Sequence, residues 1–303
     1  MIRKTKWLIV FVAALCSQFM QAQNEEWMTS LEIAQRLARR QNKMILMVWE
    51  DATTYALPVL TKDNEGQRVF VDDMFAIPQL KAALWEYFVP VVVNENMYGD
   101  LFNAINGKRS RKYIDWFNDD SLKIMDANGN ILAVSGPFTD VFDLDGFVNQ
   151  YSIDTSFLSA ELDNYAESKD FYTTFYLASK NVDFGIFVKK NIRKEILKLA
   201  GIYINESQRL LTSETEADKD LLAQRISLLN LKSELILGKS NRVLRALKKM
   251  KADEVENNNK GEIAFLYYTS HLLNKDRDKA NEWKNEVSSL NLKKAQLIIN
   301  INK

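Results

Sequence analysis

The stretch Lys43-Met44-Ile45-Leu46-Met47-Val48-Trp49-Glu50-Asp51 decides the fold of the first half of this chain. Its apolar residues follow one another without polar alternation, which is typical of a strand buried on both faces of a mixed or parallel sheet. A second such run covers residues 88–93. Helical spacing over residues 77–87 precedes it, with an expected inner stripe of Leu80, Ala83, Leu84 and Tyr87. This strand–helix–strand order predicts an α/β unit.

The segments on either side extend this unit. Thr29-Ser30-Leu31-Glu32 forms a capping box that predicts an amphipathic helix before the first strand. Residues 122–125 and 131–134 flank Asp126-Ala127-Asn128-Gly129-Asn130, whose Asn-Gly pair predicts a hairpin turn rather than a calcium loop. Residues 142–151 predict a closing helix, and residues 62–68 are expected to form a long loop.

This order of elements resembles the thioredoxin-like fold, in a subgroup of exported bacterial domains. The matching pieces are Trp27 with the capped helix at 29–40, the strand ending at Trp49, the segment 69–93, and the Asp-x-Asn-Gly hairpin before Gly136-Pro137-Phe138. The resemblance implies a mixed sheet flanked by helices over residues 24–152.

The residues that define the family's chemistry are replaced. The resemblance implies a Cys-x-x-Cys turn after the strand, but Thr53 and Ala56 occupy its cysteine positions. A cis-proline is implied before the hairpin strand, and Asp120 stands there. Neither hydroxyl nor methyl side chains transfer electrons, and a threonine without a base is a weak nucleophile. We therefore expect the fold without thiol–disulfide exchange.

Two groups of side chains near these positions are candidates for a site. Glu50, Asp51, Asp119 and Asp120 would meet if the thioredoxin-like alignment holds, as an acidic pocket or as a solvated cluster of strand ends. Trp116 and Phe117 beside Asp119 form a possible contact patch. No metal or other cofactor is expected, and lone His271 is expected to serve packing or surface.

The second half, residues 153–303, is expected to be all-α. Helical periodicity covers residues 157–168, 172–179, 185–211, 216–237, 240–251, 261–274 and 276–290. The segments 233–239 and 270–276 lie 37 residues apart, each ending one helix and opening a shorter one. They resemble degenerate tetratricopeptide-like hairpins, with an irregular helical bundle as the alternative.

Composition excludes several classes of function. The 303 residues contain 40 basic and 40 acidic side chains, so the chain has no net positive charge. We therefore do not expect it to bind the phosphates of nucleic acid. The charge is divided, with net −8 over residues 24–155 and +5 over residues 156–303. One histidine and one cysteine leave little material for zinc sites, disulfides or serine–histidine relays.

The N-terminus predicts export. Arg3, Lys4 and Lys6 precede an apolar run of residues 7–16, followed by polar residues and Ala22. This pattern is typical of a secretory signal over residues 1–22, cleaved after Ala22 to leave no membrane span. Lipoprotein processing at Cys16 is the alternative. We expect a periplasmic or secreted protein without a cysteine.

Three hypotheses of function follow. The first is a redox-inactive thioredoxin-like protein that binds or scaffolds envelope proteins. The second is an envelope enzyme that uses the acidic cluster, which requires two carboxyl groups about 5–9.5 Å apart across a cleft. The third is a helical adaptor in which residues 153–303 alone capture the partner.

Overall fold

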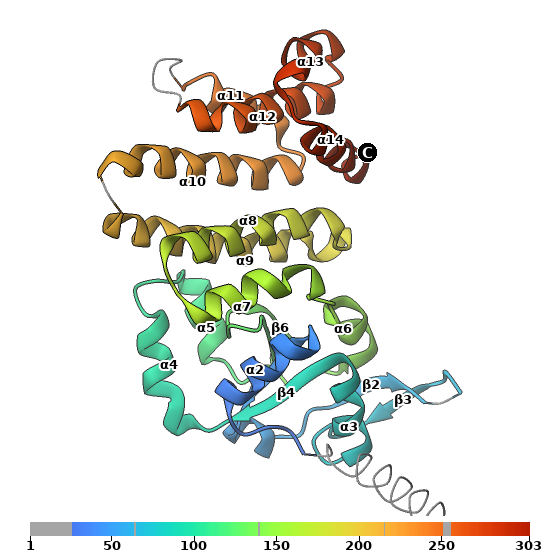
Figure 1. The fold of residues 1–303 in the computed structure, drawn as a ribbon. Helices are drawn as coiled ribbons and strands as arrows, with labels where there is room; N and C mark the ends of the chain where they lie inside the picture. Colours follow the sequence, from blue (N-terminus) through green and yellow to red (C-terminus); the bar gives the residue numbers. More distant parts are fainter. Residues whose placement is uncertain (1–25, 64, 139, 215, 251–255) are drawn as a thin grey trace, which may run out of the picture. The chain divides into compact units, whose positions relative to one another are not determined.

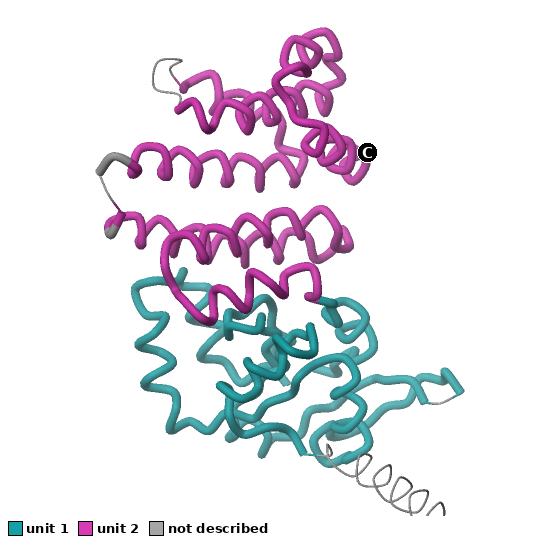
Figure 2. The backbone as a smooth tube through the Cα atoms, viewed as in Figure 1, with its two compact units in different colours: residues 1–154 teal, residues 155–303 magenta. Residues whose placement is uncertain are grey.

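The computed structural model describes residues 26–303 except 64, 139, 215 and 251–255. The predicted signal segment 1–22 and Cys16 lie outside the described residues. Contacts divide the chain into two compact units, residues 1–154 and 155–303 (Figure 2). The first mixes strands and helices and the second is helical (Figure 1).

The main sheet of the first unit is built on β1 (Met44–Trp49), all of whose residues are buried. It has the order β4-β1-β5-β6. β4 (Phe88–Val93) is parallel to β1, whereas β5 (Lys123–Met125) and β6 (Ile131–Val134) add an antiparallel hairpin. The predicted apolar strands and the hairpin are therefore confirmed, and Gly129 supplies the positive φ of its turn.

Helices flank this sheet. The predicted helix is present as α2 (Leu31–Gln41), but its N-cap is Ser30, whose hydroxyl accepts the backbone N–H of Ile33, and not Thr29 as the capping box predicts. Its residues Ala34 and Ala38 are buried, and α2 packs on β4. In the described part of the unit, the other helices are α3 (Pro78–Tyr87), α4 (Tyr98–Ile105), α5 (Arg111–Asn118) and α6 (Leu144–Tyr151), with 3-10 turns η1 (Asp51–Thr54) and η2 (Glu95–Met97).

A second, smaller sheet flanks the segment expected to be a loop. β2 (Val59–Lys62) and β3 (Arg68–Val71) form an antiparallel hairpin, and β7 (Phe142–Asp143) pairs with β2 in parallel. The loop expected over residues 62–68 is present at residues 63–67, and the strands that flank it were not expected. The Asp63 carboxylate accepts the backbone N–H groups of Glu65 and Gln67, which closes a tight turn that the sequence pattern did not indicate.

The second unit contains eight α-helices among its described residues. They are α7 (Ser159–Glu167), α8 (Phe171–Phe187), α9 (Lys190–Leu210), α10 (Glu216–Ile236), α11 (Ser240–Leu247), α12 (Lys260–Leu273), α13 (Arg277–Trp283) and α14 (Ser289–Ile301). Short 3-10 turns accompany them, namely η3 (Ser156–Leu158), η4 (Leu211–Ser213), η6 (Asn257–Asn259) and η7 (Lys284–Glu286).

The predicted break within residues 180–184 is wrong, because α8 runs through it to Phe187. Asn181 and Val182 are buried there, and the Asn181 amide donates to the carbonyl of Leu177 one turn earlier. Burial of these two side chains, with the Asn181 amide hydrogen-bonded, therefore stabilises residues 180–184 as part of the helix. The helix predicted to extend to residue 290 instead ends near Glu286, and α14 follows.

Two helix ends repeat each other at the predicted spacing. At the end of α10, Lys239 N–H donates to Glu234 O at 3.0 Å and Gly238 N–H to Leu235 O at 2.9 Å. At the end of α12, Asp276 N–H donates to His271 O at 2.9 Å and Lys275 N–H to Leu272 O at 3.0 Å. Both ends are Schellman motifs with a positive φ, at Gly238 and Lys275.

Candidate functional site

The turn after β1 uses its hydroxyl groups locally. Thr53 Oγ1 donates to the carbonyl of Glu50 at 2.7 Å, and Thr54 Oγ1 donates to the carbonyl of Asp51 at 2.6 Å. A backbone carbonyl does not act as a base, so neither hydroxyl is activated as a nucleophile by the group that receives its proton. Ala56 is exposed. The turn is therefore a capped 3-10 segment with no reactive group.

The predicted acidic residues lie at the edge of the main sheet where its two parallel strands end. Since β4 is parallel and β5 antiparallel to β1, the ends of β1 and β4 and the start of β5 share that edge. Glu50 accepts a hydrogen bond from the Asn94 amide after β4. Asp119 accepts hydrogen bonds from Ser121, through its hydroxyl and, at 3.0 Å, its backbone N–H. Asp120 is exposed.

Asp51 is joined to the same edge by its backbone. Its N–H donates to Glu95 Oε1 at 2.8 Å. Glu50 and Asp51 are thus fixed to the segment after β4, whereas Asp119 is fixed to the start of β5. The hydrogen bonds of Glu50 and Asp119 hold the local backbone and neighbouring side chains in place, and among the described residues none links Glu50 or Asp51 to Asp119 or Asp120.

Aromatic rings pack together beneath this edge. Trp49 Nε1 donates to the carbonyl of Phe117 at 2.9 Å, and their rings meet edge to face with centroids 5.3 Å apart. Tyr98 and Phe102 of α4 pack against Phe117. Phe117 is only 4% exposed, so the expectation that it forms a contact surface is wrong. Trp116 is half-buried, with Lys112 Nζ 4.9 Å from its ring centroid.

Lys123 is a buried cation at this edge that sequence reasoning missed. It has no exposed surface, and its ammonium donates to the carbonyls of Asp119 at 2.5 Å and Ser121 at 3.0 Å. Burial lowers its pKa, an effect that the Asp119 carboxylate partly offsets. Because its donors face two carbonyls and Asp119, Lys123 fixes the chain before β5 and does not face a substrate.

The hairpin borders an apolar groove in the first unit. β2, β3, α3 and α6 surround a hollow of about 610 Å³. Its apolar lining is Val69, Val71, Ile77, Leu80, Ala83, Leu84, Tyr87, Leu144 and Val148. Of the expected inner stripe of α3, only Leu84 is buried. The prediction of a fully buried stripe is therefore wrong, because the rest of this face lines the groove.

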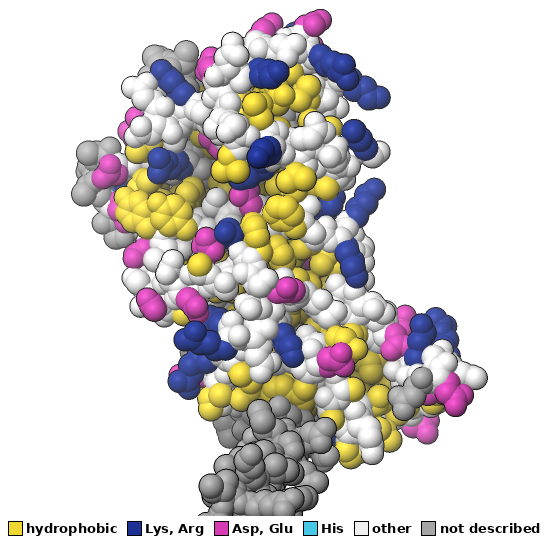
Figure 3. All heavy atoms as spheres, turned by 45° about the vertical axis from the view of Figure 1, so that its right-hand side comes forward, with side chains coloured by type: hydrophobic (Ala, Val, Ile, Leu, Met, Phe, Trp, Pro, Cys, Tyr) yellow, Lys and Arg dark blue, Asp and Glu magenta, His cyan; other side chains and the backbone are white. Residues whose placement is uncertain are grey.

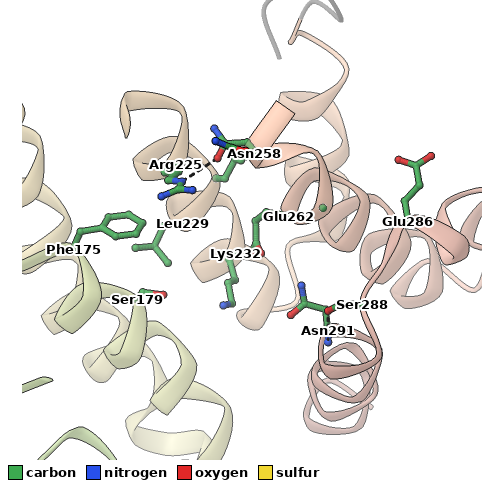
Figure 4. A pocket seen from close by; sticks show the side chains of 13 residues that line it. Phe175, Ser179, Arg225, Leu229, Lys232, Asn258, Glu262, Glu286, Ser288 and Asn291 are labelled. Atoms are coloured by element: carbon green, nitrogen blue, oxygen red, sulfur yellow. Dashed lines mark hydrogen bonds between the residues drawn. The ribbon is translucent and has the colours of Figure 1, made fainter. Parts of the chain in front are cut away.

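A second pocket, of about 380 Å³, lies within the helical unit between α8, α10, α12 and the start of α14. Figure 4 shows the side chains of Lys232, Glu262 and Asn291 directed toward the same space. The lining includes two basic residues, Arg225 and Lys232, and two acidic residues, Glu262 and Glu286, so its formal charges balance and select neither an anion nor a cation.

Lys232 belongs to a buried ion cluster beside that pocket. Its ammonium lies 2.6 Å from Asp183 Oδ1, and Lys294 Nζ lies 2.7 Å from Asp183 Oδ2. Burial opposes ionisation of all three groups. The two ammonium groups nevertheless lower the pKa of Asp183, and Asp183 raises that of Lys232. The cluster joins α8, α10 and α14 and explains why these helices accept buried charge.

His271 has a packing role, in agreement with its expected interpretation. It is buried, with its ring stacked at 6.3 Å from Tyr267 and its Nδ1 3.9 Å from Asp276 Oδ2. Burial lowers its pKa.

Among the described residues, no group of three or more His, Cys, Asp or Glu side chains is placed to hold a metal ion. No helix in the described part of the chain combines the length and the apolar character needed to cross a bilayer. No family model matches the chain, and neither curated proteins nor solved structures gave a match.

Proposed function

We propose that this chain is a non-catalytic protein-binding module of the bacterial cell envelope. In this proposal, residues 24–152 are a thioredoxin-like scaffold without redox sulfur, and residues 153–303 form a tetratricopeptide-like helical part. The N-terminal charge and apolar pattern supports export, and the lone Cys16 would leave with the signal segment.

The strand arrangement supports the thioredoxin-like part of this proposal. A central strand is followed by the replaced turn, a parallel strand, an antiparallel hairpin and a closing helix, in the order β4-β1-β5-β6. Met28 adds a parallel bridge beside β4, with its carbonyl accepting Val92 N–H at 2.8 Å. The repeated Schellman turns at Gly238 and Lys275 support repeated hairpins in the helical part.

One contrast within the first unit favours binding over catalysis. The edge where redox chemistry would occur is closed by local hydrogen bonds and by Trp49 and Phe117, whereas the groove beside the hairpin is open and apolar. Exposed apolar surface of this kind is typical of interaction sites. The alternative, a carboxylate-dependent enzyme, gains no support, because Glu50 and Asp119 are engaged in structural hydrogen bonds.

Site-specific photocrosslinking in the native host tests this function. A benzophenone amino acid replaces Phe70 on the hairpin, Tyr55 near the replaced turn, or Tyr176 in the helical unit, all of which are exposed. We expect a discrete crosslinked protein from position 70 and none from positions 55 and 176. Capture only from position 176 would instead favour the helical-adaptor hypothesis. Reduction of insulin disulfides by the purified protein would contradict a non-catalytic role.

A further inference from the structure

The free edge of β3 presents a regular set of backbone groups. The sheet order is β3-β2-β7, so β3 is paired only on its β2 side in the described structure. Asp63 N–H donates to Gln67 O at 3.0 Å at the start of the ladder. Hydrogen-bonded pairs alternate in an antiparallel ladder, and therefore Val69 and Val71 also bond toward β2. The N–H and C=O groups of Arg68 and Phe70 then point outward.

The opposite side of β2 supports this assignment. Phe142 N–H donates to the carbonyl of Pro58, so even-numbered residues at this end of β2 face β7 and odd-numbered ones face β3. The same alternation leaves Arg68 and Phe70 as the outward pair on β3.

β3 is short and carries one charged side chain, Arg68, but its sequence contains no lysine or proline that would prevent strand pairing. Natural edge strands carry lysine, proline or bulges that prevent another chain from adding to them. β3 has the sequence Arg68-Val69-Phe70-Val71, and Phe70 is 52% exposed. Val69 and Val71 line the groove. A strand added to this edge would place every second side chain beside these valines and the groove.

The charge around the hairpin selects the partner. Residues 59–87 and 142–149 contain three basic and seven acidic side chains, including Asp63 and Asp145 in the groove lining. Figure 3 shows apolar side chains next to the charged end of the hairpin. A basic segment would be attracted to this surface, whereas an acidic segment would be repelled.

We propose that β3 binds an extended segment of a partner polypeptide, with alternating apolar and basic residues, as an added strand. The partner's backbone bonds to Arg68 and Phe70, and its apolar side chains lie toward the groove with Val69 and Val71. Its basic side chains lie on the opposite face beside Arg68 and Phe70, where the net negative charge of the surrounding segments attracts them. This inference rests on the proposed protein-binding function and specifies its mode and the chemistry of the partner.

A proline substitution tests the backbone contribution. Phe70→Pro removes an outward N–H without breaking a bond to β2, as proline is tolerated at such edge positions. Phe70→Ala removes the same ring but keeps the N–H, so comparison of the two isolates the backbone. Val69→Pro is expected to disrupt the hairpin itself, since Val69 bonds toward β2. Hydrogen exchange of the hairpin amides verifies that Phe70→Pro retains the β2–β3 ladder.

The probe is a fluorescein-labelled octapeptide of alternating valine and lysine, titrated against the full chain by fluorescence anisotropy. We expect saturable binding that is at least tenfold weaker with the valine–glutamate counterpart. We also expect binding at least fivefold weaker with Phe70→Pro than with Phe70→Ala.

Several outcomes overturn the inference. Equal binding by the two Phe70 variants excludes strand addition, and equal affinity for the acidic peptide excludes the charge argument. Dimerisation in sedimentation velocity that is lost in Phe70→Pro identifies a second copy of the chain as the occupant instead. If strand addition fails while benzophenone at position 70 still captures a partner, the protein-binding function stands and only the mode is wrong.

Discussion

At the scale of single residues, Lys123 shows how tertiary burial overrides a sequence pattern. Its place in the alternating segment Leu122-Lys123-Ile124-Met125 suggests a polar face, yet all three residues of β5 are buried. The local sequence does not contain the reason, which is that β5 lies inside the sheet between β1 and β6. The carbonyls of Asp119 and Ser121 satisfy the ammonium there.

Substitution of Lys123 by methionine tests this assignment through pH. Burial lowers the pKa of Lys123 in the folded state, so the unfolded chain binds more protons between that lowered pKa and about 10.5. Wild-type stability therefore gains from this group as pH rises through that window. We expect the free energy of unfolding of Lys123→Met, relative to wild type, to fall between pH 7 and pH 10 in urea titrations. A difference that stays constant would contradict a buried, titrating lysine.

Asp183 supports a second residue-scale prediction. In Asp183→Asn, the ammonium groups of Lys232 and Lys294 lose their shared carboxylate in a buried site. We expect a loss of about 3–5 kcal/mol in the free energy of unfolding at pH 7. The exposed Asp220→Asn in α10 is the matched control and should change stability by less than about 0.5 kcal/mol.

The effect of Asp183 has a defined pH dependence. Its folded pKa is lowered from 3.8, so its contribution is fully present above about pH 4 and is lost as pH falls through the folded value. The difference between wild type and Asp183→Asn should therefore shrink under acid conditions, as measured by denaturant unfolding.

At the scale of elements, the two Schellman turns are a natural pair for comparison. Gly238 adopts φ 76° and Lys275 adopts φ 63°, with equivalent hydrogen bonds. A glycine is suited to this conformation, whereas a lysine is strained in it. A Cβ at position 238 would also lie 2.8 Å from Asn302 Oδ1.

Opposite substitutions should therefore have opposite effects. We expect Lys275→Gly to raise the free energy of unfolding by about 0.5–1 kcal/mol, and Gly238→Ala to lower it by about 1–2 kcal/mol. Gly201→Ala within α9 is the control, because it meets no atom within 4 Å and should stabilise by about 0.5–1 kcal/mol. Destabilisation by Lys275→Gly in urea titrations would contradict the assigned turn.

The elements that could be predicted from sequence are those whose signal is local. The apolar runs at 44–49 and 88–93 and the Asn-Gly hairpin depend on nearby residues alone. The β2–β3 hairpin could not be found this way, because β3 is largely exposed, β2 is only partly buried and the turn depends on hydrogen bonds to the Asp63 carboxylate. The meeting of the acidic residues was expected from the thioredoxin-like resemblance, but the hydrogen bond of Glu50 depends on Asn94, which is distant in the sequence.

At the scale of the whole chain, two compact units have separate cores. The division at residues 154 and 155 falls between α6 and η3, and each unit buries its own apolar residues. Units with their own cores are expected to fold alone. We therefore predict that residues 24–154 and 155–303, expressed separately, each unfold in one cooperative transition by circular dichroism.

Because the two units can be expressed separately, the partner-binding half can be identified by measuring each fragment. Since β3 and its groove lie entirely within residues 59–149, a folded fragment of residues 24–154 should bind the valine–lysine octapeptide with the affinity of the full chain. The fragment of residues 155–303 carries a net positive charge and should not bind the basic octapeptide. Binding by the helical fragment instead would move the interaction surface out of the first unit. It would also leave the exposed hydrophobic residues of the hairpin without a role.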